Sequence, residues 1–218
     1  MREADTKQRI VYTFVTNPSD LGDELTRTNS TGLSDAVNYS ANIDLIETFF
    51  GERAKIGMLY NPNEDNSVHG INAVESIISK SHPNMELMKA TVIQEADIPT
   101  VTAQVASRVN VIYIGGDNTV VGAIAAVGNE ALRKGIPVFA SDEGSIMSVA
   151  IAGFSVDYKK LGIETAMVVK QVLDGKEPRE VPRITLKGDR LIINRVAARQ
   201  WNFSIPEEIL KKADHVIE

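Results

Sequence analysis

Short runs of aliphatic and β-branched residues alternate along the chain with segments whose apolar residues recur every three or four positions. The runs predict strands at 10–15, 56–60, 86–92, 111–114, 137–140, 149–154 and 191–193. The helical spacing predicts helices over about 43–50, 67–80, 98–108, 118–134 and 157–173, and a helical tail near Pro206. Strands that alternate with helices in this way indicate βαβ units, an α/β fold and a parallel sheet.

Residues 55–155 form the most regular part of this pattern. They hold five predicted strands, which should make one complete doubly wound parallel sheet. The 111–114 strand, Val-Ile-Tyr-Ile, is apolar at every position, as expected of a parallel strand covered by helices on both faces. Near the C-terminus, Trp201 and Phe203 are expected to pack the tail against the body of the protein.

Four of the predicted strands are followed by polar loops. Ligands bind outside the carboxyl ends of the strands in an open parallel sheet, so these loops are the expected binding site. The candidate ligand-binding residues in and beside them are Thr16, Asn17, Tyr60, Asn61, Glu64, Asn66, Ser67, Asp117, Asn118, Asp142 and Glu143. Residues of these types also form turns and cap helices, and Ser67 and Asn118 are the candidate N-caps.

Three of the candidates, Asp117, Asp142 and Glu143, carry carboxylates that the predicted sheet places at one edge. Converging carboxylates favour a cationic group, such as the ammonium of an amino acid. A Mg²⁺ ion is the alternative that these residues leave open. The stretch 61–65 is similar to the start of a calcium-binding loop, but Asn66 and Asn72 stand where that loop needs glycine and glutamate, so no calcium site is expected.

Composition narrows the classes of function. The 218 residues carry a net charge of −6 with scattered Lys and Arg, so nucleic-acid binding is not expected. The chain has no cysteine, and its three histidines lie far apart in sequence. It lacks the glycine-rich phosphate loop and the nucleophilic-serine motif. We therefore expect a binding protein without cofactor or metal rather than an enzyme.

Several segments together resemble a known family. They are IGMLYNPNEDNS (56–67), VIYIGGDNTVVGAI (111–124), GIPVFASDEGSI (135–146), DYKKLGIETAMVVKQVLDGKEP (157–178) and LIINRVAARQWNFSIPEEILKKAD (191–214). They are similar, in this order, to motifs of the ABC-transporter substrate-binding proteins linked with tryptophan and tyrosine uptake. The resemblance runs from about residue 10 to residue 218 and is specific to the family, though not to one ligand.

The resemblance implies a type I periplasmic binding protein fold, in which two lobes close on a ligand by hinge motion. It assigns residues 1–54 to a partial lobe 1 and residues 55–155 to a complete lobe 2. Residues 156–218 are then a helix that returns to lobe 1, a short strand and a C-terminal helical segment. Family members carry further residues before the position of Ile10, so the resemblance implies an N-terminally truncated chain whose incomplete lobe could pair in a homodimer.

In function, the resemblance implies the substrate-binding component of an ABC importer, which captures a small polar solute, expected to be an aromatic amino acid, in an interlobe cleft. The partner is a cognate permease, and the location is the periplasm or, with a lipid anchor, the outer face of the membrane, although the polar N-terminus here lacks a signal sequence. Asp142 is the first choice for the ammonium, because the residue after this strand commonly binds ligand in this fold. The alternative is the ligand-sensing domain of a transcription regulator of the same fold.

Overall fold

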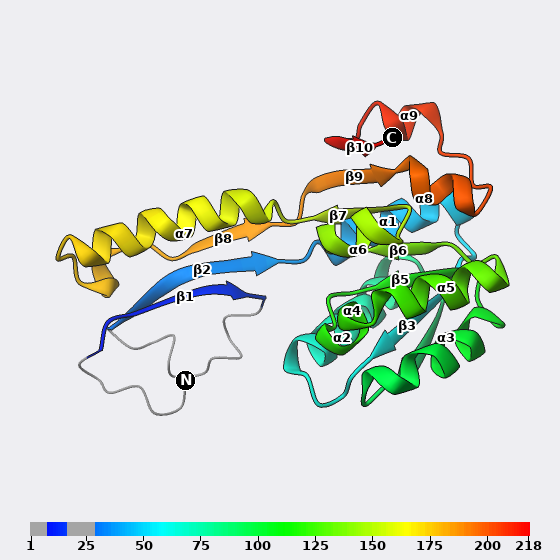
Figure 1. The fold of residues 1–218 in the computed structure, drawn as a ribbon, viewed down its shortest axis with the longest axis horizontal. Helices are drawn as coiled ribbons and strands as arrows, with labels where there is room; N and C mark the ends of the chain where they lie inside the picture. The colour runs from blue at the N-terminus through cyan, green and yellow to red at the C-terminus, as the bar shows by residue number, and fades with distance from the viewer. Residues whose placement is uncertain (1–7, 17–28) are drawn as a thin grey trace. The chain divides into compact units, whose positions relative to one another are not determined.

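The computed structural model of the protein describes residues 8–16 and 29–218, and the chain divides into two compact units. Unit 1 consists of Met1–Ala36 and Val156–Gly188, and unit 2 consists of Val37–Ser155 and Asp189–Glu218. Figure 1 labels the elements of both units along the chain. Each unit has its own sheet and its own apolar core.

The elements of unit 2 are α1 (Tyr39–Phe50), β3 (Lys55–Tyr60), α2 (Asp65–Ser81), β4 (Glu86–Thr91), η2 (Glu95–Asp97), α3 (Ile98–Ala106), β5 (Val111–Ile114), α4 (Asn118–Gly122), α5 (Ile124–Lys134), β6 (Val138–Ala140), α6 (Glu143–Ser148), β7 (Ala152–Ser155), β9 (Arg190–Asn194), α8 (Arg195–Gln200), α9 (Glu207–Leu210) and β10 (His215–Ile217). The described elements of unit 1 are β1 (Ile10–Val15), β2 (Ser30–Ala36), α7 (Tyr158–Leu173), η3 (Pro178–Glu180) and β8 (Ile184–Lys187).

Unit 2, which the structure describes throughout, is built on a seven-stranded sheet in the order β10-β9-β7-β6-β5-β3-β4. Within this sheet, the five strands from β3 to β7 pair with one another in parallel only. This confirms the five-stranded parallel sheet predicted for 55–155. Beyond the prediction, β9 adds antiparallel to β7, and β10 adds parallel to β9.

The central strand β5 shows how the sequence specifies this sheet. Its side chains alternate between two cores, with Val111 and Tyr113 in the core that includes α1 and α2. Ile112 and Ile114 lie in the other core, together with residues of α3, α4, α5 and α6. All four side chains are fully buried, because helices cover both faces of the sheet (Figure 1).

In the described part of unit 1, β1, β2 and β8 form a parallel sheet in the order β1-β2-β8. The helix α7 covers one face, where its Leu161 and Val168 pack with Leu33 of β2. The N-cap of α7 is Asp157, whose side chain accepts a hydrogen bond from the N–H of Lys160 at 2.9 Å. The described residues of unit 1 therefore form a small layered structure in which the helix α7 packs on the sheet.

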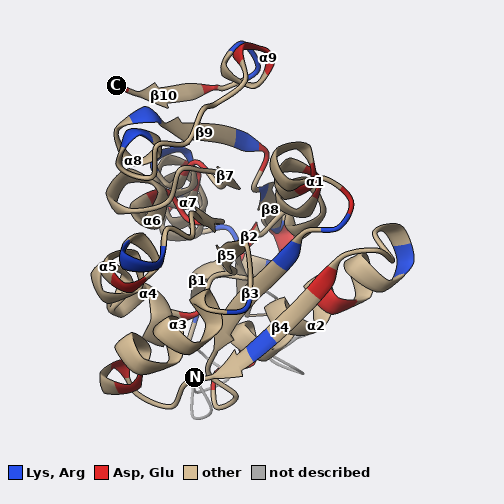
Figure 2. Cartoon of the chain, turned by 90° about the vertical axis from the view of Figure 1, so that its right-hand side faces the viewer, with Lys and Arg blue, Asp and Glu red and all other residues tan. Residues whose placement is uncertain are grey.

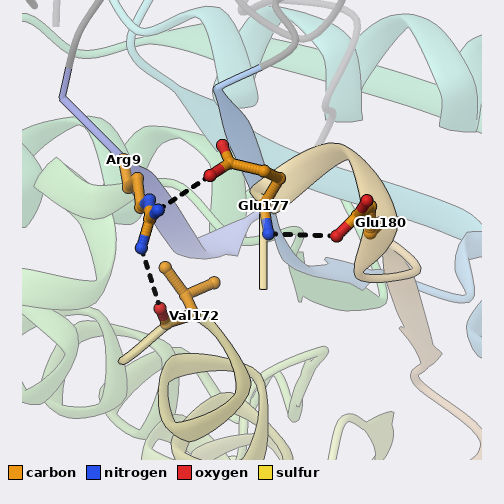
Figure 3. Close-up of polar contacts among 4 residues, drawn as sticks. All are labelled: Arg9, Val172, Glu177 and Glu180. Carbon is orange, nitrogen blue, oxygen red and sulfur yellow. Dashed lines mark hydrogen bonds and ion pairs between the residues drawn. The ribbon is translucent and has the colours of Figure 1, made fainter. Parts of the chain in front are cut away.

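A polar contact joins the start of β1 to the end of α7 (Figure 3). Arg9 Nη2 donates to Glu177 Oε1 at 2.7 Å, and Arg9 Nη1 donates to the Val172 carbonyl at 3.4 Å. The N–H of Glu177 donates to Glu180 Oε2 at 3.2 Å, within the turn η3. The ion pair between Arg9 and Glu177 is about half exposed, so it contributes about 0–1 kcal/mol to the free energy of unfolding.

The structure corrects the expected place of residues 37–54. We expected this stretch in lobe 1, but α1 belongs to unit 2, where Ile43 and Ile46 are fully buried in the core that contains Tyr113. Helical spacing shows that one face of α1 is buried, but it does not show which sheet covers that face. Residues 189–218 also belong to unit 2.

Other differences concern short elements. The expected helix 118–134 is interrupted at Ala123, which has φ −109° and ψ 27° and separates α4 from α5. The expected loop after β6 contains α6, and the helical tail ends in the strand β10. The strands β2 and β8 were not predicted, because each carries several polar residues. The predicted packing of the tail is confirmed at Phe203, whose ring lies 5.5 Å from that of Phe49.

Candidate functional site

The loop after β5 is organised by the carboxylate of Asp117, a residue that is 3% exposed. Asp117 Oδ2 accepts hydrogen bonds from the N–H of Asn61 at 2.6 Å and from the hydroxyl of Ser67 at 2.5 Å. Its Oδ1 accepts from the N–H of Val120 at 2.7 Å, so Asp117 is the N-cap of α4. Three donors satisfy this buried carboxylate, which leaves it little capacity for a ligand.

Glu64, in the loop after β3, brings a second carboxylate to the start of α4. Its Oε2 accepts from the N–H of Asn118 at 2.9 Å, and its Oε1 accepts from the N–H of Thr119 at 3.1 Å and from the Thr119 hydroxyl at 2.5 Å. Burial alone would raise the pKa of Glu64, but the hydrogen bonds from Thr119 and Asn118 outweigh burial and lower this pKa. Glu64 is therefore a charged partner of the first turn of α4.

Two amides complete the connection between these loops. Asn61 Nδ2 donates to Thr119 Oγ1 at 2.9 Å, and Asn66 Nδ2 donates to the carbonyl of Gly116 at 2.9 Å. The structure thus brings together Asn61, Glu64, Asn66, Ser67, Asp117 and Asn118, as the sequence predicted. Most of their polar groups bond to one another, so this set, which we call the inner network, is largely satisfied internally.

The candidate N-caps were assigned wrongly from the sequence. Asp117 caps α4, and Asn118 is its first helical residue. Ser67 lies inside the first turn of α2, whose N-cap position is held by Glu64 without a side-chain cap bond. Each true N-cap precedes the predicted one. Asp117 accepts hydrogen bonds from its own helix and from the loop after β3, whereas Glu64 accepts hydrogen bonds from the start of α4.

Asp142, after β6, differs from the inner network. Its Oδ1 accepts from the N–H of Ser145 at 2.7 Å, which makes Asp142 the N-cap of α6. Its Oδ2 is buried and has no hydrogen-bond partner among the residues that the structure describes, and the same holds for Ser145 Oγ. Unpaired buried polar atoms cost about 1–3 kcal/mol each, so a group that paired with them would bind favourably.

The phenol of Tyr113 contributes to the surroundings of Asp142. Burial raises the pKa of Tyr113 well above its usual value, and the nearby Tyr39 and Asp142 raise it further. The phenol therefore stays protonated and neutral at physiological pH.

Glu143 has a partner of its own. Arg190 Nη1 donates to Glu143 Oε1 at 2.9 Å, and both side chains are about one quarter exposed. Of the three carboxylates expected to converge on a cation, Glu143 is thus paired with arginine and Asp117 is satisfied internally. Of these three carboxylates, Asp142 has the buried oxygen without a partner among the described residues, and the role of each of the three in ligand binding stays a prediction.

The remaining candidates lie at the ends of other strands. Tyr60 ends β3 and is partly buried beside the core that includes α1 and α2. Thr16 follows β1 in unit 1, where its side chain lies close enough to Asp35 to lower the pKa of that carboxyl. Asn17 lies outside the described residues.

Asp35 is a candidate that the sequence did not reveal. It lies near the end of β2, is 7% exposed, and has an Oδ1 without a hydrogen-bond partner among the described residues. Burial raises the pKa of Asp35, and its own N–H and the nearby Thr16 offset this only in part. The segment 30–36, Ser-Thr-Gly-Leu-Ser-Asp-Ala, reads as a turn, so the strand that would have marked Asp35 as a strand-end carboxylate was not predicted.

Two further features of the described residues concern metals and membranes. Within 8–16 and 29–218, the structure has no grouping of three or more His, Asp or Glu side chains suited to a metal ion. Over the same residues, none of the helices has the length and apolar character needed to cross a membrane. Lys, Arg, Asp and Glu are spread over many helices and strands in Figure 2.

The family profile described as "ABC transporter substrate binding protein" matches residues 3–217. The chain belongs to this family. This substrate-binding protein is 30% identical over 189 residues to a "Tyrosine-binding protein" of Clostridioides difficile (strain R20291), a match that covers 85% of the chain and 54% of the relative. The chain therefore spans about half the length of that relative.

Solved structures of similar proteins agree on the fold. A conserved domain protein of Vibrio cholerae is 34% identical with a TM-score of 0.86, and the match covers 95% of this chain and 71% of the other. An "ABC domain in complex with L-Trp" from Streptococcus pneumoniae is 25% identical with a TM-score of 0.86 and the same coverage. The substrate-binding protein thus has the type I periplasmic binding protein fold.

A LacI family transcriptional regulator of Bifidobacterium animalis is 14% identical with a TM-score of 0.53. This similarity concerns the fold alone. It fits the expectation that sensor domains of regulators share the fold, but it gives the regulator alternative no further support.

Proposed function

We propose that this substrate-binding protein captures an aromatic amino acid for an ABC importer and performs no catalysis. The observation that carries the proposal is the Oδ2 of Asp142 at the carboxyl edge of the unit 2 sheet, which is buried and has no partner among the described residues. An ammonium ion is the cation that fits it, because a single carboxylate oxygen is a poor site for a divalent metal but a good hydrogen-bond acceptor. Support for an aromatic ligand comes from the relative named for tyrosine and from the similar structure in complex with L-Trp.

The ligand's carboxylate needs donors as well, because a buried unpaired charge costs several kcal/mol. The sequence suggested Thr16, Asn66 and Ser67, but the hydroxyl of Ser67 already donates to Asp117. Ser145 offers a better donor in unit 2, since its hydroxyl has no partner among the described residues and its N–H bonds to Asp142. We therefore assign Asp142 and Ser145 as the adjacent acceptor and donor for the ligand's charged end.

The wider role is also part of the proposal. Members of the family deliver their solute to a membrane permease and work outside the cytoplasmic membrane, so we propose a permease partner and a periplasmic or lipid-anchored location. Capture between two lobes, which the sequence resemblance implies, belongs to the same proposal. The homodimer through unit 1 stays a prediction.

Titration calorimetry tests the proposal. L-tyrosine and L-tryptophan should bind, whereas D-ribose should not, because a sugar cannot provide a cation for Asp142. Asp142→Asn is the informative variant, since an asparagine oxygen can still cap α6 while the negative charge is lost. Failure of every amino acid to bind, or binding of a sugar in preference, would contradict the proposed function.

A further inference from the structure

A cavity of about 400 Å³ lies in unit 2 between α1, the strands β7 and β9 and the short helix α9. All of its lining residues belong to unit 2. Its apolar walls are Leu45, Phe154, Leu191 and Ile209, which pack in or against the core that includes α1 and α2. A cavity of this volume is within the range of sites that bind small molecules.

This cavity is separate from the candidate site at Asp142. Leu191 of β9 belongs to the core on the α1 face of the sheet, whereas the next residue, Ile192, belongs to the core on the other face. That other core also contains Ile146 of α6, the helix that Asp142 caps. The cavity therefore lies on one face of the sheet and α6 on the other, and none of the candidate ligand-binding residues of unit 2 lines the cavity.

Four charged side chains line the cavity together with its apolar walls. They are Asp44 of α1, Asp189 just before β9, and Lys212 and Asp214 between α9 and β10. Three aspartates and one lysine give the lining a net charge of −2. Charge complementarity therefore favours a cationic occupant.

The three carboxylates keep acceptor capacity for such an occupant. Asp189 has no ion pair or side-chain hydrogen bond among the described residues. Asp214 Oδ2 accepts a hydrogen bond from the N–H of Leu191 at 2.8 Å, and Asp44 Oδ1 lies 3.1 Å from His82 Nε2. A carboxylate has two acceptor oxygens, so Asp44 and Asp214 can each accept a further hydrogen bond from an ammonium group.

The arrangement of these carboxylates favours an organic cation over a metal ion. The described residues contain no grouping of three or more His, Asp or Glu side chains suited to a metal, so the three aspartates do not converge on one point. Asp44 lies on α1, whereas Asp189 and Asp214 lie at the starts of β9 and β10, and the apolar walls complete the lining. Two ammonium groups joined by a methylene chain match this arrangement, because the charges meet carboxylates and the chain meets apolar surface.

We propose that this cavity is a second binding site of the protein and that it takes a linear aliphatic diamine. One ammonium group pairs with Asp44, and the other pairs with Asp189 and Asp214. The methylene chain lies against the apolar walls, and the two positive charges neutralise the lining. This inference goes beyond the proposed function, because a diamine has neither the carboxylate nor the aromatic ring of the proposed amino-acid ligand.

The test is a titration of the isotope-labelled protein with putrescine, followed by NMR spectroscopy. The reporter is the amide of Leu191, because its N–H bonds to Asp214 in the cavity wall. We expect putrescine to shift this resonance in a saturable way that weakens with added salt. Butylamine, which keeps the chain but loses one charge, should bind about fivefold more weakly, on the scale of one exposed ion pair. Mg²⁺ should not reproduce the shift.

Two substitutions with opposite expected effects distinguish binding from loss of structure. Asp189→Asn should raise the dissociation constant of putrescine about threefold to fivefold, because it removes one ion pair. Lys212→Gln should lower this constant by a similar factor, because it removes a like charge from the cavity. Glu208→Gln is the matched control, since Glu208 is exposed on α9 and does not line the cavity.

Each of the contrary outcomes is specific. Equal binding of butylamine and putrescine would show that the cavity takes a single cation, such as a basic side chain of a partner protein, and would overturn the inference. The inference is also overturned by an unmoved Leu191 amide, or by an Asp189→Asn variant that binds putrescine like the wild type. Calorimetric titration with L-tyrosine in the presence of putrescine keeps the two sites apart, since its affinity should be unchanged whatever the diamine does.

Discussion

The loops after β5 and β6 both place an aspartate at the start of a short helix, yet the two carboxylates are in different states. Asp117 caps α4 and also accepts two hydrogen bonds from the loop after β3. Asp142 caps α6 with one oxygen and keeps the other buried and unpaired among the described residues. The difference comes from the neighbours, because Asn61 and Ser67 supply donors to Asp117 and no described residue donates to Asp142 Oδ2. One aspartate therefore stabilises the unit, and the other is available to a ligand.

The largest expected effect is on stability at Asp117. Asp117→Ala removes the acceptor of three hydrogen bonds and leaves buried donors unpaired, so we expect it to lower the free energy of unfolding by about 3 kcal/mol. Urea denaturation followed by circular dichroism measures this change. Asp174→Ala is the control, since Asp174 is an exposed residue at the end of α7 and its loss should cost little. Equal effects of the two substitutions would show that the inner network does not stabilise unit 2.

The next effect is on affinity at Asp142. Asp142→Asn and Asp142→Ala should weaken amino-acid binding by at least about 2 kcal/mol, the scale of a lost buried charge partner. Asp142→Asn should leave the unfolding free energy nearly unchanged because the cap of α6 is kept, whereas Asp142→Ala should lower it by about 1 kcal/mol. Calorimetric titration and urea denaturation of the same samples separate the two quantities. Wild-type affinity in Asp142→Asn would remove Asp142 from the binding site.

A smaller effect is expected at Ser67. Ser67→Ala deletes one donor to Asp117, so it should lower the free energy of unfolding by about 1 kcal/mol. Ser145→Ala is its counterpart at the other loop, where the hydroxyl has no partner among the described residues to lose. We expect Ser145→Ala to weaken ligand binding with little change in stability, and Ser67→Ala to show the reverse. Equal effects of Ser67→Ala and Ser145→Ala on stability and on binding would contradict the difference drawn here between Asp117 and Asp142.

The smallest effect concerns Asp35, a third strand-end aspartate. Burial raises the pKa of Asp35 in the folded protein above its ordinary value of 3.8, so the folded state holds this proton to higher pH than the unfolded chain. Stability must then fall as pH rises from about 4 through the raised pKa, and it stays lower above that pKa. Asp35→Asn removes the ionisable group, so the variant should not lose stability in this way as the pH rises.

Melting temperatures measured between pH 4 and pH 7 test the expectation for Asp35. The variant Asp35→Asn should melt higher than the wild type at pH 7, and the difference should shrink toward pH 4. A lower melting temperature for the variant at pH 7 would show that the charged carboxylate stabilises unit 1. A stabilised variant with weaker ligand binding would identify Asp35 as a residue retained for function.

The sequence predicted the parts of the fold whose signal is local and apolar. Four apolar residues in β5 indicated a strand covered on both faces, and its bounds agree with the structure. The pattern could not assign α1 to a unit. The apolar face of an amphipathic helix shows that the helix packs on another element, but it does not show which sheet that element belongs to. The pattern also missed β2, which carries the buried polar residues Thr31, Ser34 and Asp35. Thr31 and Ser34 are satisfied through contacts distant in sequence, such as the bond from Thr31 Oγ1 to the Val181 carbonyl.

The candidate site shows the same limit. Strand-end positions placed Asp117 and Asp142 correctly at one edge of the sheet, because topology alone determines that edge. Two of the three donors to Asp117, on Asn61 and Ser67, lie 56 and 50 residues earlier in the chain, and no local pattern reveals them.

The central claim is that Asp142, and not Asp117, pairs with the ligand's ammonium group. A crystal structure of the protein with L-tyrosine or L-tryptophan tests it most directly. The ammonium nitrogen should lie about 3 Å from Asp142 Oδ2, and Asp117 should keep its hydrogen bonds to Asn61, Ser67 and Val120. An ammonium group bound to Asp117 in place of these donors, or bound elsewhere while Asp142 Oδ2 stays unpaired, would contradict the account.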